Sequence, residues 1–128
     1  MSSITYGDGF AVDEFLALAQ RVWPRDYPRD SAAAALTRTI NIAARDGTEL
    51  VGSVRVLTDG YFFATVPEIL VDPAYQRRGI GRGLMELALD AAPRGKLAFG
   101  AQPQSVAFFE RIGCRRGLTG FVAERPLI

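Results

Sequence analysis

The sequence predicts an α/β (α+β) fold in which helices cover one mixed sheet, and three observations point to it. The chain has 128 residues, of which 48% are hydrophobic and 23% charged, enough for one core and one domain over residues 1–128. Segments with apolar residues at helical spacing alternate with short runs rich in β-branched residues. Their order, β-α-α-β-β-β-α-β-α-β-β, brings helices and strands into adjacent layers.

The first half of the chain combines two short helices with strands joined by tight turns. Phe15 and Leu18 fall on one face of the first predicted helix. The Asp-Gly pairs at 46–47 and 59–60 are hairpin-turn signals. Pro67 interrupts the strand pattern and predicts a break or bulge. The elements expected in this half are a strand at 4–6, helices at 10–23 and 32–36, and strands at 39–44, 50–57, 61–66 and 69–71.

The second half alternates helices with short strands. Ile80, Leu84 and Leu87 lie on one face of a predicted helix of about three turns, which Pro93 stops. Gly113 caps the C-terminal end of the next helix. The elements expected in this half are a helix at 80–91, a strand at 96–100, a helix at 104–112, and a last hairpin formed by 114–116 and 121–123.

Charge and hydropathy exclude several classes of function. The 15 basic and 14 acidic residues give a net charge of +1, without the strong basic excess of a general nucleic-acid binder. No apolar run approaches the ~18 residues of a membrane helix, and the N-terminus has no basic segment followed by an apolar stretch. We therefore expect no nucleic-acid partner, no membrane partner and a cytoplasmic location.

Residue types needed for several kinds of catalysis are missing from the sequence. The chain has no histidine and a single cysteine, Cys114. Ser-His-Asp and Cys-His catalysis, histidine bases and histidine-ligated metal sites are therefore excluded, and we expect no metal. The single cysteine also excludes an intramolecular disulfide, which fits a reducing compartment.

One segment has the features of a binding site. In it, an apolar strand leads through a loop into a helix. Gly79 and Gly81 stand at the start of this helix, where unpaired backbone N–H groups and the positive end of the helix dipole meet. Glycines let a ligand approach that backbone closely. With the charges of Arg77, Arg78 and Arg82 nearby, the pattern predicts an anion site suited to a phosphate or pyrophosphate.

Two other phosphate-binding loops fit this segment poorly. A Walker loop needs Gly-x-x-x-x-Gly-Lys-Ser/Thr, and the only lysine of the chain is Lys96. A dinucleotide fingerprint needs Gly-x-Gly-x-x-Gly directly after a strand, whereas the glycines here stand at 79, 81 and 83 and residues 72–78 intervene. The spacing therefore disfavours both loops.

Residues 76–81, with the sequence QRRGIG, match the signature Gln/Arg-x-x-Gly-x-Gly/Ala at every specified position. In this the chain resembles the GNAT acetyltransferase superfamily. Residues 102–114 are similar to a second family block, Asn-x-x-Ala/Ser-x-x-Phe/Leu-Tyr-Glu-Lys-x-Gly-Phe. The order of strands and helices also matches the family over nearly the whole chain. The positions that match the second block are Ser105, Phe108, Glu110 and Gly113, with a conservative change at Arg111.

The resemblance implies a GNAT fold, with a twisted, mostly antiparallel sheet of about six to seven strands flanked by about four helices. The strand at 69–71 and the strand at 96–100 would splay apart to admit the cosubstrate, acetyl-CoA. The backbone at 77–82 would hold its pyrophosphate, and the strand at 69–71 would pair with the pantetheine arm and polarise the thioester carbonyl. The residues implied in cofactor binding are Ile69, Leu70, Val71, Gln76, Arg77, Arg78, Gly79, Ile80, Gly81, Arg82, Gln102 and Phe108.

The catalytic positions of the family are only partly retained. Its usual tyrosine, which protonates the leaving thiolate, corresponds to Phe109, and phenylalanine cannot donate a proton. Ser105, Tyr61, Tyr75 and water are the alternatives for this acid. Glu68, just before the acetyl site, is the expected general base for the attacking amine.

The resemblance implies an acetyl-CoA-dependent N-acetyltransferase that passes the acetyl group directly to a primary amine of a small molecule or a peptide. Phe109 supports an alternative, a weakly active or inactive GNAT domain that serves as an acyl-CoA sensor or an interaction module. A third interpretation is a binder of a different phosphate ligand on the same loop. A homodimer is one assembly that the family allows.

Overall fold

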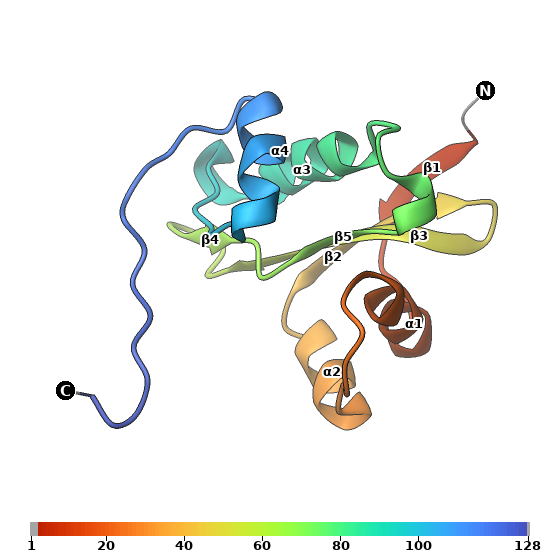
Figure 1. The fold of residues 1–128 in the computed structure, drawn as a ribbon, viewed down its shortest axis with the longest axis horizontal. Helices are drawn as coiled ribbons and strands as arrows, with labels where there is room; N and C mark the ends of the chain where they lie inside the picture. The colour runs from red at the N-terminus through yellow and green to blue at the C-terminus, as the bar shows by residue number, and fades with distance from the viewer. Residues whose placement is uncertain (1–2, 128) are drawn as a thin grey trace.

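The sheet lies between two pairs of helices. The computed structural model describes residues 3–127, and Figure 1 shows α1 and α2 on one face of the sheet and α3 and α4 on the other. Within residues 3–127, none of the helices is long and apolar enough to cross a membrane. The strands are β1 (Ile4–Asp8), β2 (Ile40–Asp46), β3 (Glu49–Thr58), β4 (Ala64–Thr65) and β5 (Ile69–Val71). The helices are α1 (Val12–Val22), α2 (Arg29–Leu36), α3 (Ile80–Ala91) and α4 (Val106–Arg111), with 3-10 turns η1 (Pro73–Tyr75), η2 (Pro93–Gly95) and η3 (Pro103–Ser105).

The strands pair in the order β1-β2-β3-β4, and β5 also pairs with β3. Each of these pairings is antiparallel, so the described sheet is antiparallel rather than mixed. β4 pairs with Leu57 and Thr58 of β3, whereas β5 pairs with Gly52–Val54. The break that Pro67 predicts is confirmed, because it separates β4 from β5 along one edge of β3.

Helix α1 packs on the sheet through one apolar face. Phe15, Leu18 and Ala19 are buried in a cluster that also holds residues of β2, β3 and β5. Glu14 stabilises the first turn, because its carboxylate accepts a hydrogen bond from the Ala11 N–H at 2.7 Å. The same carboxylate takes two hydrogen bonds, at 2.7 and 2.8 Å, from the guanidinium of Arg45 at the end of β2.

Helix α3 lies close against the opposite face of the sheet. A Cβ at Gly52 of β3 would stand 3.0 Å from Ile80 Cγ2 and 3.1 Å from Leu84 Cδ1. A Cβ at Gly83 of α3 would stand 2.6 Å from the hydroxyl of Tyr6 in β1. Glycine at both positions therefore sets how closely the helix approaches the strands. This packing holds α3 against β1 and β3.

Residues 96–100 do not form the strand that their sequence predicts. Among the described residues, one backbone hydrogen bond ties this segment to the sheet, from the Ala98 N–H to the carbonyl of Ala64 at 3.0 Å. The turns η2 and η3, each begun by a proline, bracket the segment and leave only a short extended run. The segment meets β4 but forms no ladder with β5 in the described residues. β5 and this segment are therefore not paired with each other within the described residues.

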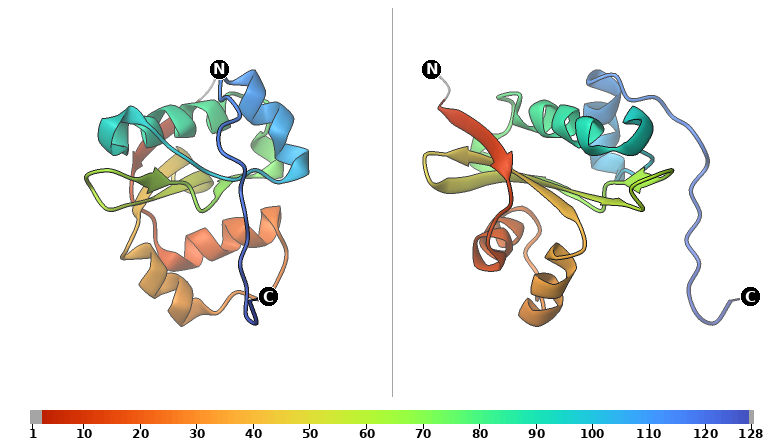
Figure 2. Two further views of the ribbon diagram at one scale, coloured as in Figure 1. Left: turned by 90° about the vertical axis from the view of Figure 1, so that its left-hand side faces the viewer. Right: turned by 180° about the vertical axis from the view of Figure 1, so that it is seen from behind.

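The last hairpin, expected at 114–116 and 121–123, does not form. In the right view of Figure 2, the chain after α4 runs outside the body. A two-stranded hairpin is stable only when it can bury a face against a sheet. Because residues 96–100 are not a paired strand, they provide no established sheet edge for the hairpin to extend.

Candidate functional site

The loop between β5 and α3 is anchored to the body by Asp72. This residue is 6% exposed, and its carboxylate accepts hydrogen bonds from the Ala74 N–H at 2.9 Å and from Arg21 Nε of α1 at 2.7 Å. Arg21 Nη2 also donates to the carbonyl of Leu50 in β3 at 3.1 Å. A buried carboxylate needs such partners, because burying an unpaired charge is costly. The loop therefore leaves β5 from a fixed point.

The turn into α3 exposes backbone N–H groups. Gly79 is the N-cap of the helix, with φ 81° and ψ 5°, and Arg77 has φ 64°, so both adopt left-handed conformations. The Gly83 N–H donates to the Gly79 carbonyl at 3.0 Å. The N–H groups of residues 80–82 therefore precede the first hydrogen bond of the helix and have no partner within it. Such a turn at a positive helix end forms a concave site for an anion.

The outer edge of β5 is free for pairing within the described residues. Alternate residues of a strand direct their backbone groups to opposite edges. The Glu68 carbonyl accepts from the Arg55 N–H of β3 at 3.3 Å, and the Asp72 N–H donates to the Val51 carbonyl of β3 at 2.8 Å. By the same alternation, residue 70 faces β3, while residues 69 and 71 direct their backbone groups to the open edge.

The three strand residues expected at the cofactor therefore differ. Leu70 stands opposite Ser53, and its side chain is buried on the α1 side of the sheet. Ile69 and Val71 pack on the α3 side. The side-chain amide of Gln76 donates to the Val71 carbonyl at 3.3 Å, which ties the loop back to the strand end. Of the three, only Ile69 and Val71 present backbone groups to a ligand at the open edge.

Phe108 of α4 lies directly over the start of α3. A Cβ at Gly81 would stand 2.8 Å from the Cζ of its ring. The neighbouring Phe109 is 8% exposed and packs in the core with ring centroids 5.0 Å from Phe108 and 4.8 Å from Phe99. Ile80 is 2% exposed, so its side chain belongs to the core and only its backbone faces the turn. Gly81 thus leaves the space in which α4 packs over the start of α3.

The three arginines near this turn are in different environments. The guanidinium of Arg78 stacks on the ring of Tyr75, 5.0 Å from its centroid. Arg82 Nε lies 3.1 Å from Oε1 of Glu86, one helical turn along α3. Arg77 makes no ion pair and no ring contact among the described residues. Its side chain is therefore the one least committed to the protein itself.

Glu68 lies on the segment between β4 and β5, beside Arg55 of β3. The Arg55 guanidinium donates two hydrogen bonds to its carboxylate, from Nε and Nη2, each at 2.6 Å. The pair is partly buried, with side-chain exposures of 28% for Glu68 and 16% for Arg55. The Arg55 guanidinium also lies 6.0 Å from the ring centroid of Phe15 in α1. Glu68 is thus held in one orientation on the α1 side of the sheet.

The candidate acids and the expected pantetheine partner, Gln102, lie in different parts of the molecule. Ser105 ends η3 and precedes α4, and its side chain makes no capping hydrogen bond. Gln102, the expected pantetheine partner, is exposed at the start of η3. Tyr61 is 75% exposed in the turn between β3 and β4. The Tyr75 hydroxyl donates to Asp46 Oδ2 at 2.6 Å, and this hydrogen bond raises the pKa of Tyr75.

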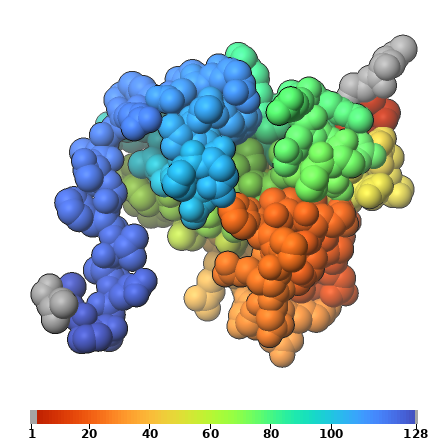
Figure 3. Space-filling view, viewed as in Figure 1, coloured from red at the N-terminus to blue at the C-terminus, as the bar shows by residue number. Residues whose placement is uncertain are grey.

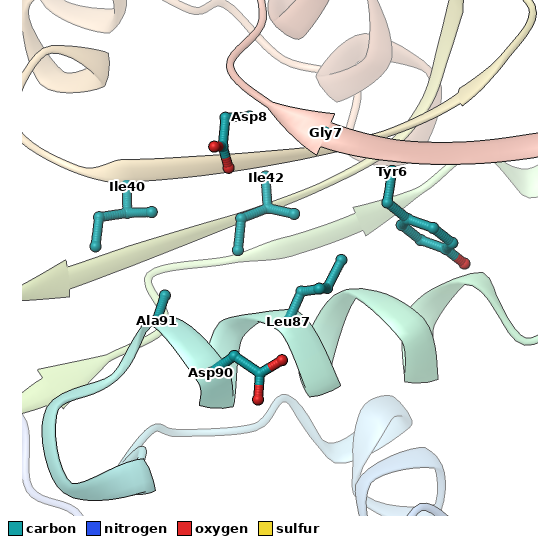
Figure 4. A pocket seen from close by; sticks show the side chains of 8 residues that line it. All are labelled: Tyr6, Gly7, Asp8, Ile40, Ile42, Leu87, Asp90 and Ala91. Atoms are coloured by element: carbon teal, nitrogen blue, oxygen red, sulfur yellow. The ribbon is translucent and has the colours of Figure 1, made fainter.

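A groove of about 440 Å³ lies at the other end of α3. Figure 4 shows its walls, formed by β1, β2 and the C-terminal end of the helix, with Asp8 and Asp90 at its polar positions. Its charge is opposite to that of the turn at Gly79, and none of its lining residues belongs to the 69–82 segment. The groove and the turn with unpaired N–H groups therefore lie at opposite ends of α3.

The comparison with known families agrees with the geometry of the turn. A sequence profile described as the acetyltransferase (GNAT) family matches residues 10–114. The chain belongs to this family. It is 31% identical over 130 residues to the probable acetyltransferase TAP2 of Glycine max. The alignment covers 88% of this chain and 52% of that relative. The chain thus spans about half the length of this curated relative.

Solved structures of GNAT proteins share the fold. A GNAT family acetyltransferase from Streptococcus pneumoniae TIGR4 superposes with a TM-score of 0.79 at 25% identity, covering 96% of this chain and 97% of that one. The structure of AAC(6')-Iy in complex with the bisubstrate analog CoA-S-monomethyl-acetylneamine has a TM-score of 0.78 at 16% identity, covering 97% and 99%. At this identity, the second likeness concerns the fold alone.

Sequence reasoning missed Arg55, which holds the candidate base. The signal was available, because Arg55 is the one charged residue between Leu50 and Leu57 in an apolar strand. A charge in such a strand needs a partner on a neighbouring strand. The partner is 13 residues away in sequence, on a segment whose pairing register Pro67 obscures. The register therefore had to be known before the pair could be found.

Proposed function

We propose that the protein transfers an acetyl group from acetyl-CoA to a primary amine of a small molecule or a peptide. One observation carries the proposal: the open edge of β5 leads directly to the free N–H groups at the start of α3. A pyrophosphate needs several fixed N–H donors, and an extended amide-containing arm needs an unpaired strand edge. These two features lie one after the other along the chain, separated only by the anchored loop.

Acetyl-CoA would supply the acetyl group as a thioester. In the proposed complex, the N–H groups of residues 80–82 hold the pyrophosphate. The N–H and carbonyl of Ile69 and the N–H of Val71 pair with the pantetheine arm and orient the thioester. A backbone N–H at this edge is suited to stabilise the negative charge that develops on the carbonyl oxygen during attack. Phe108 covers the turn and limits the access of water to it.

Glu68 is proposed as the general base. The attacking amine nitrogen forms a bond to the carbonyl carbon, the carbon–sulfur bond breaks, and the amine loses a proton to the Glu68 carboxylate. The Arg55 guanidinium keeps that carboxylate oriented on the side of the sheet that α1 covers. A thiol pKa near ~8.5 makes the CoA thiolate a tolerable leaving group, so its departure needs no acid from the protein. Water then protonates the thiolate.

A second function is favoured by Phe109. It stands where the resemblance places a tyrosine acid, and it is buried among other aromatic rings. A domain that binds acyl-CoA and reports it would need the same turn and strand edge but no acid. The two functions predict the same binding and differ only in turnover.

The test combines calorimetric titration with acetyl-CoA and CoA and an assay of free-thiol release against amines and peptides. Binding with amine-dependent thiol release supports the transferase. Binding without release across a broad panel favours the sensor. Failure to bind either compound, together with binding of a nucleotide, would favour the third interpretation, a site for a different phosphate ligand.

Glu68→Gln tests the assignment of the base. We expect kcat to fall by roughly 10²-fold or more, because an amide cannot accept the proton. The calorimetric affinity for acetyl-CoA should stay the same, because Glu68 does not belong to the proposed phosphate or pantetheine contacts. Glu86→Gln, an exposed carboxylate on α3, serves as the matched control and should keep full turnover.

A further inference from the structure

Two arginine–glutamate pairs in this protein are bidentate, and they differ in the donors that the arginine has left. Arg45 at the end of β2 uses Nη1 and Nη2 for Glu14 of α1, and the same two atoms also donate to backbone carbonyls. Arg55 of β3 uses Nε and Nη2 for Glu68, and its Nη1 makes no hydrogen bond among the described residues. The first pair joins a strand to a helix, whereas the second leaves donors unused.

The unused donors of Arg55 are held in a fixed place that solvent reaches. The one buried side-chain N or O atom without a partner in residues 3–127 is Ser53 Oγ, so the unpaired Nη1 of Arg55 is not buried. Glu68 holds one edge of the guanidinium, and the ring centroid of Phe15 lies 6.0 Å from its central carbon. The remaining N–H groups on Nη1 and Nη2 form a second fork, which suits a carboxylate that accepts two hydrogen bonds.

This fork belongs to the side of the sheet that α1 covers. The lower, orange part of the surface in Figure 3 belongs to α1, α2 and the loop between them, below the light blue part that holds α4. The Arg55 guanidinium packs toward Phe15 of α1, whereas Phe108 of α4 packs over the start of α3. An acceptor that reaches Glu68 from the α1 side therefore meets Arg55 and Glu68 together.

The charge balance of this pair changes during the proposed acetyl transfer. Before the reaction, the Glu68 carboxylate and the Arg55 guanidinium neutralise each other. When the carboxylate takes the proton of the attacking amine, it becomes neutral, and Arg55 loses its partner at a position where its side chain is only 16% exposed. An unpaired charge at such a position is costly. An acceptor with its own carboxylate next to the amine would replace the lost partner.

We propose that the acceptor is a free α-amino acid, whose carboxylate binds the second fork of Arg55 while its amine faces Glu68. The substrate has an ammonium beside a carboxylate, and the protein has a carboxylate beside a guanidinium, so opposite charges match. A simple alkylamine brings only a positive charge close to Arg55. In a peptide, the α-carboxyl group of the first residue is part of an amide bond and cannot bind as an anion. This assignment rests on the proposed acetyl transfer.

Thiol release with matched acceptors tests the substrate class. Each common L-amino acid is compared with its carboxamide and with the amine that lacks the carboxyl group, for example leucine with leucinamide and 3-methylbutylamine. For the best amino acid, we expect kcat/KM to exceed that of both counterparts by about 10-fold, the effect of one charge-assisted hydrogen-bonded contact. The carboxamide keeps a weakly basic α-amino group, so it separates recognition of the carboxylate from ease of deprotonation. Carboxamides or amines used as well as the amino acids would overturn the proposal.

Arg55→Lys tests the residue, and Arg45→Lys is its matched control. Lysine keeps a positive charge beside Glu68 but lacks the planar fork of arginine, so we expect the preference for the amino acid to fall to about 2-fold. Arg45→Lys changes the other bidentate pair and should keep the full preference. Thermal unfolding checks that both variants fold. A preference that Arg55→Lys leaves unchanged, or that both variants lose equally, would contradict the role of Arg55.

A binding measurement separates failure of this proposal from failure of the acetyl transfer. Calorimetric titration of the wild-type chain with the same acceptors, in the presence of CoA, needs no turnover. Amino acids that bind about 10-fold more tightly than their carboxamides, without thiol release, would support the recognition and contradict the transferase. Thiol release from amines without any preference for amino acids would support the transferase and overturn the recognition. Absence of binding by every amino acid would also overturn it.

Discussion

The two ends of α3 differ in what they offer a ligand. The N-terminal end has free N–H groups, a left-handed turn and arginines, but none of its residues lines the groove of about 440 Å³. The C-terminal end borders the groove, with apolar walls and two carboxylates, Asp8 and Asp90. A phosphate-bearing ligand is attracted to the first and repelled by the second. The proposed site therefore rests on the charge and direction of backbone groups and not on the volume of a groove.

The largest expected effect comes from placing a carboxylate at the N-terminal end. Gly81→Asp should weaken CoA binding by roughly 100-fold, about 2.7 kcal/mol, because it adds a negative charge next to the N–H groups proposed to hold the phosphate and crowds the ring of Phe108. Calorimetric titration measures it, and circular dichroism checks the fold. The matched change at the other end, Asp90→Asn, should leave the affinity for CoA unchanged. Equal affinities of Gly81→Asp and the wild type would refute the assignment of the turn.

A smaller effect distinguishes two glycines on the same helix. Gly81→Ala places a methyl group against the ring of Phe108, and we expect about a 5-fold loss of CoA affinity as α4 shifts over the turn. Gly83→Ala is equally crowded, but against the hydroxyl of Tyr6 on β1, away from the turn. It should leave CoA affinity unchanged. Similar losses in both variants would mean that helix packing, and not the turn, controls binding.

How much of this could be predicted from the sequence differs between the two ends. The turn at Gly79 is encoded locally, since the glycines, the arginines and the helix start lie within a few residues of one another. The groove joins β1, β2 and the far end of α3, so it exists only after the sheet has paired. The pairing of Arg55 with Glu68 and the failure of 96–100 to join the sheet depend on long-range register in the same way.

The arginines near the turn offer a further comparison. Arg77→Asn should weaken CoA binding about 5-fold, close to 1 kcal/mol, because it removes a charge that the protein does not otherwise use. Asparagine tolerates the left-handed conformation of this residue, so the backbone is not disturbed. Arg82→Ala should change the affinity less, since Glu86 already pairs with this side chain. Titrations at two salt concentrations measure both, and the reverse ranking would contradict the prediction.

The smallest effect concerns acid stability beside the turn. Hydrogen bonds from Ser3 and Tyr75 lower the pKa of Asp46 below its ordinary value of 3.8. A lowered pKa in the folded state contributes stability above the unfolded pKa, and that contribution is lost as the pH falls through the folded pKa. Thermal unfolding between pH 6 and about pH 3 should therefore show a loss confined to the acid end of this range. Asp46→Asn should show a smaller loss over the same interval, and an identical loss would contradict the assignment to this carboxylate.

Backbone amide NMR during titration with CoA shows where the ligand binds, because it monitors both ends of α3 in one experiment. We expect the largest shifts at the N–H groups of Ile80, Gly81 and Arg82, with further shifts at Ile69 and Val71. Shifts confined to the groove residues around Asp8 and Asp90, or the absence of shifts at the start of α3, would contradict this prediction.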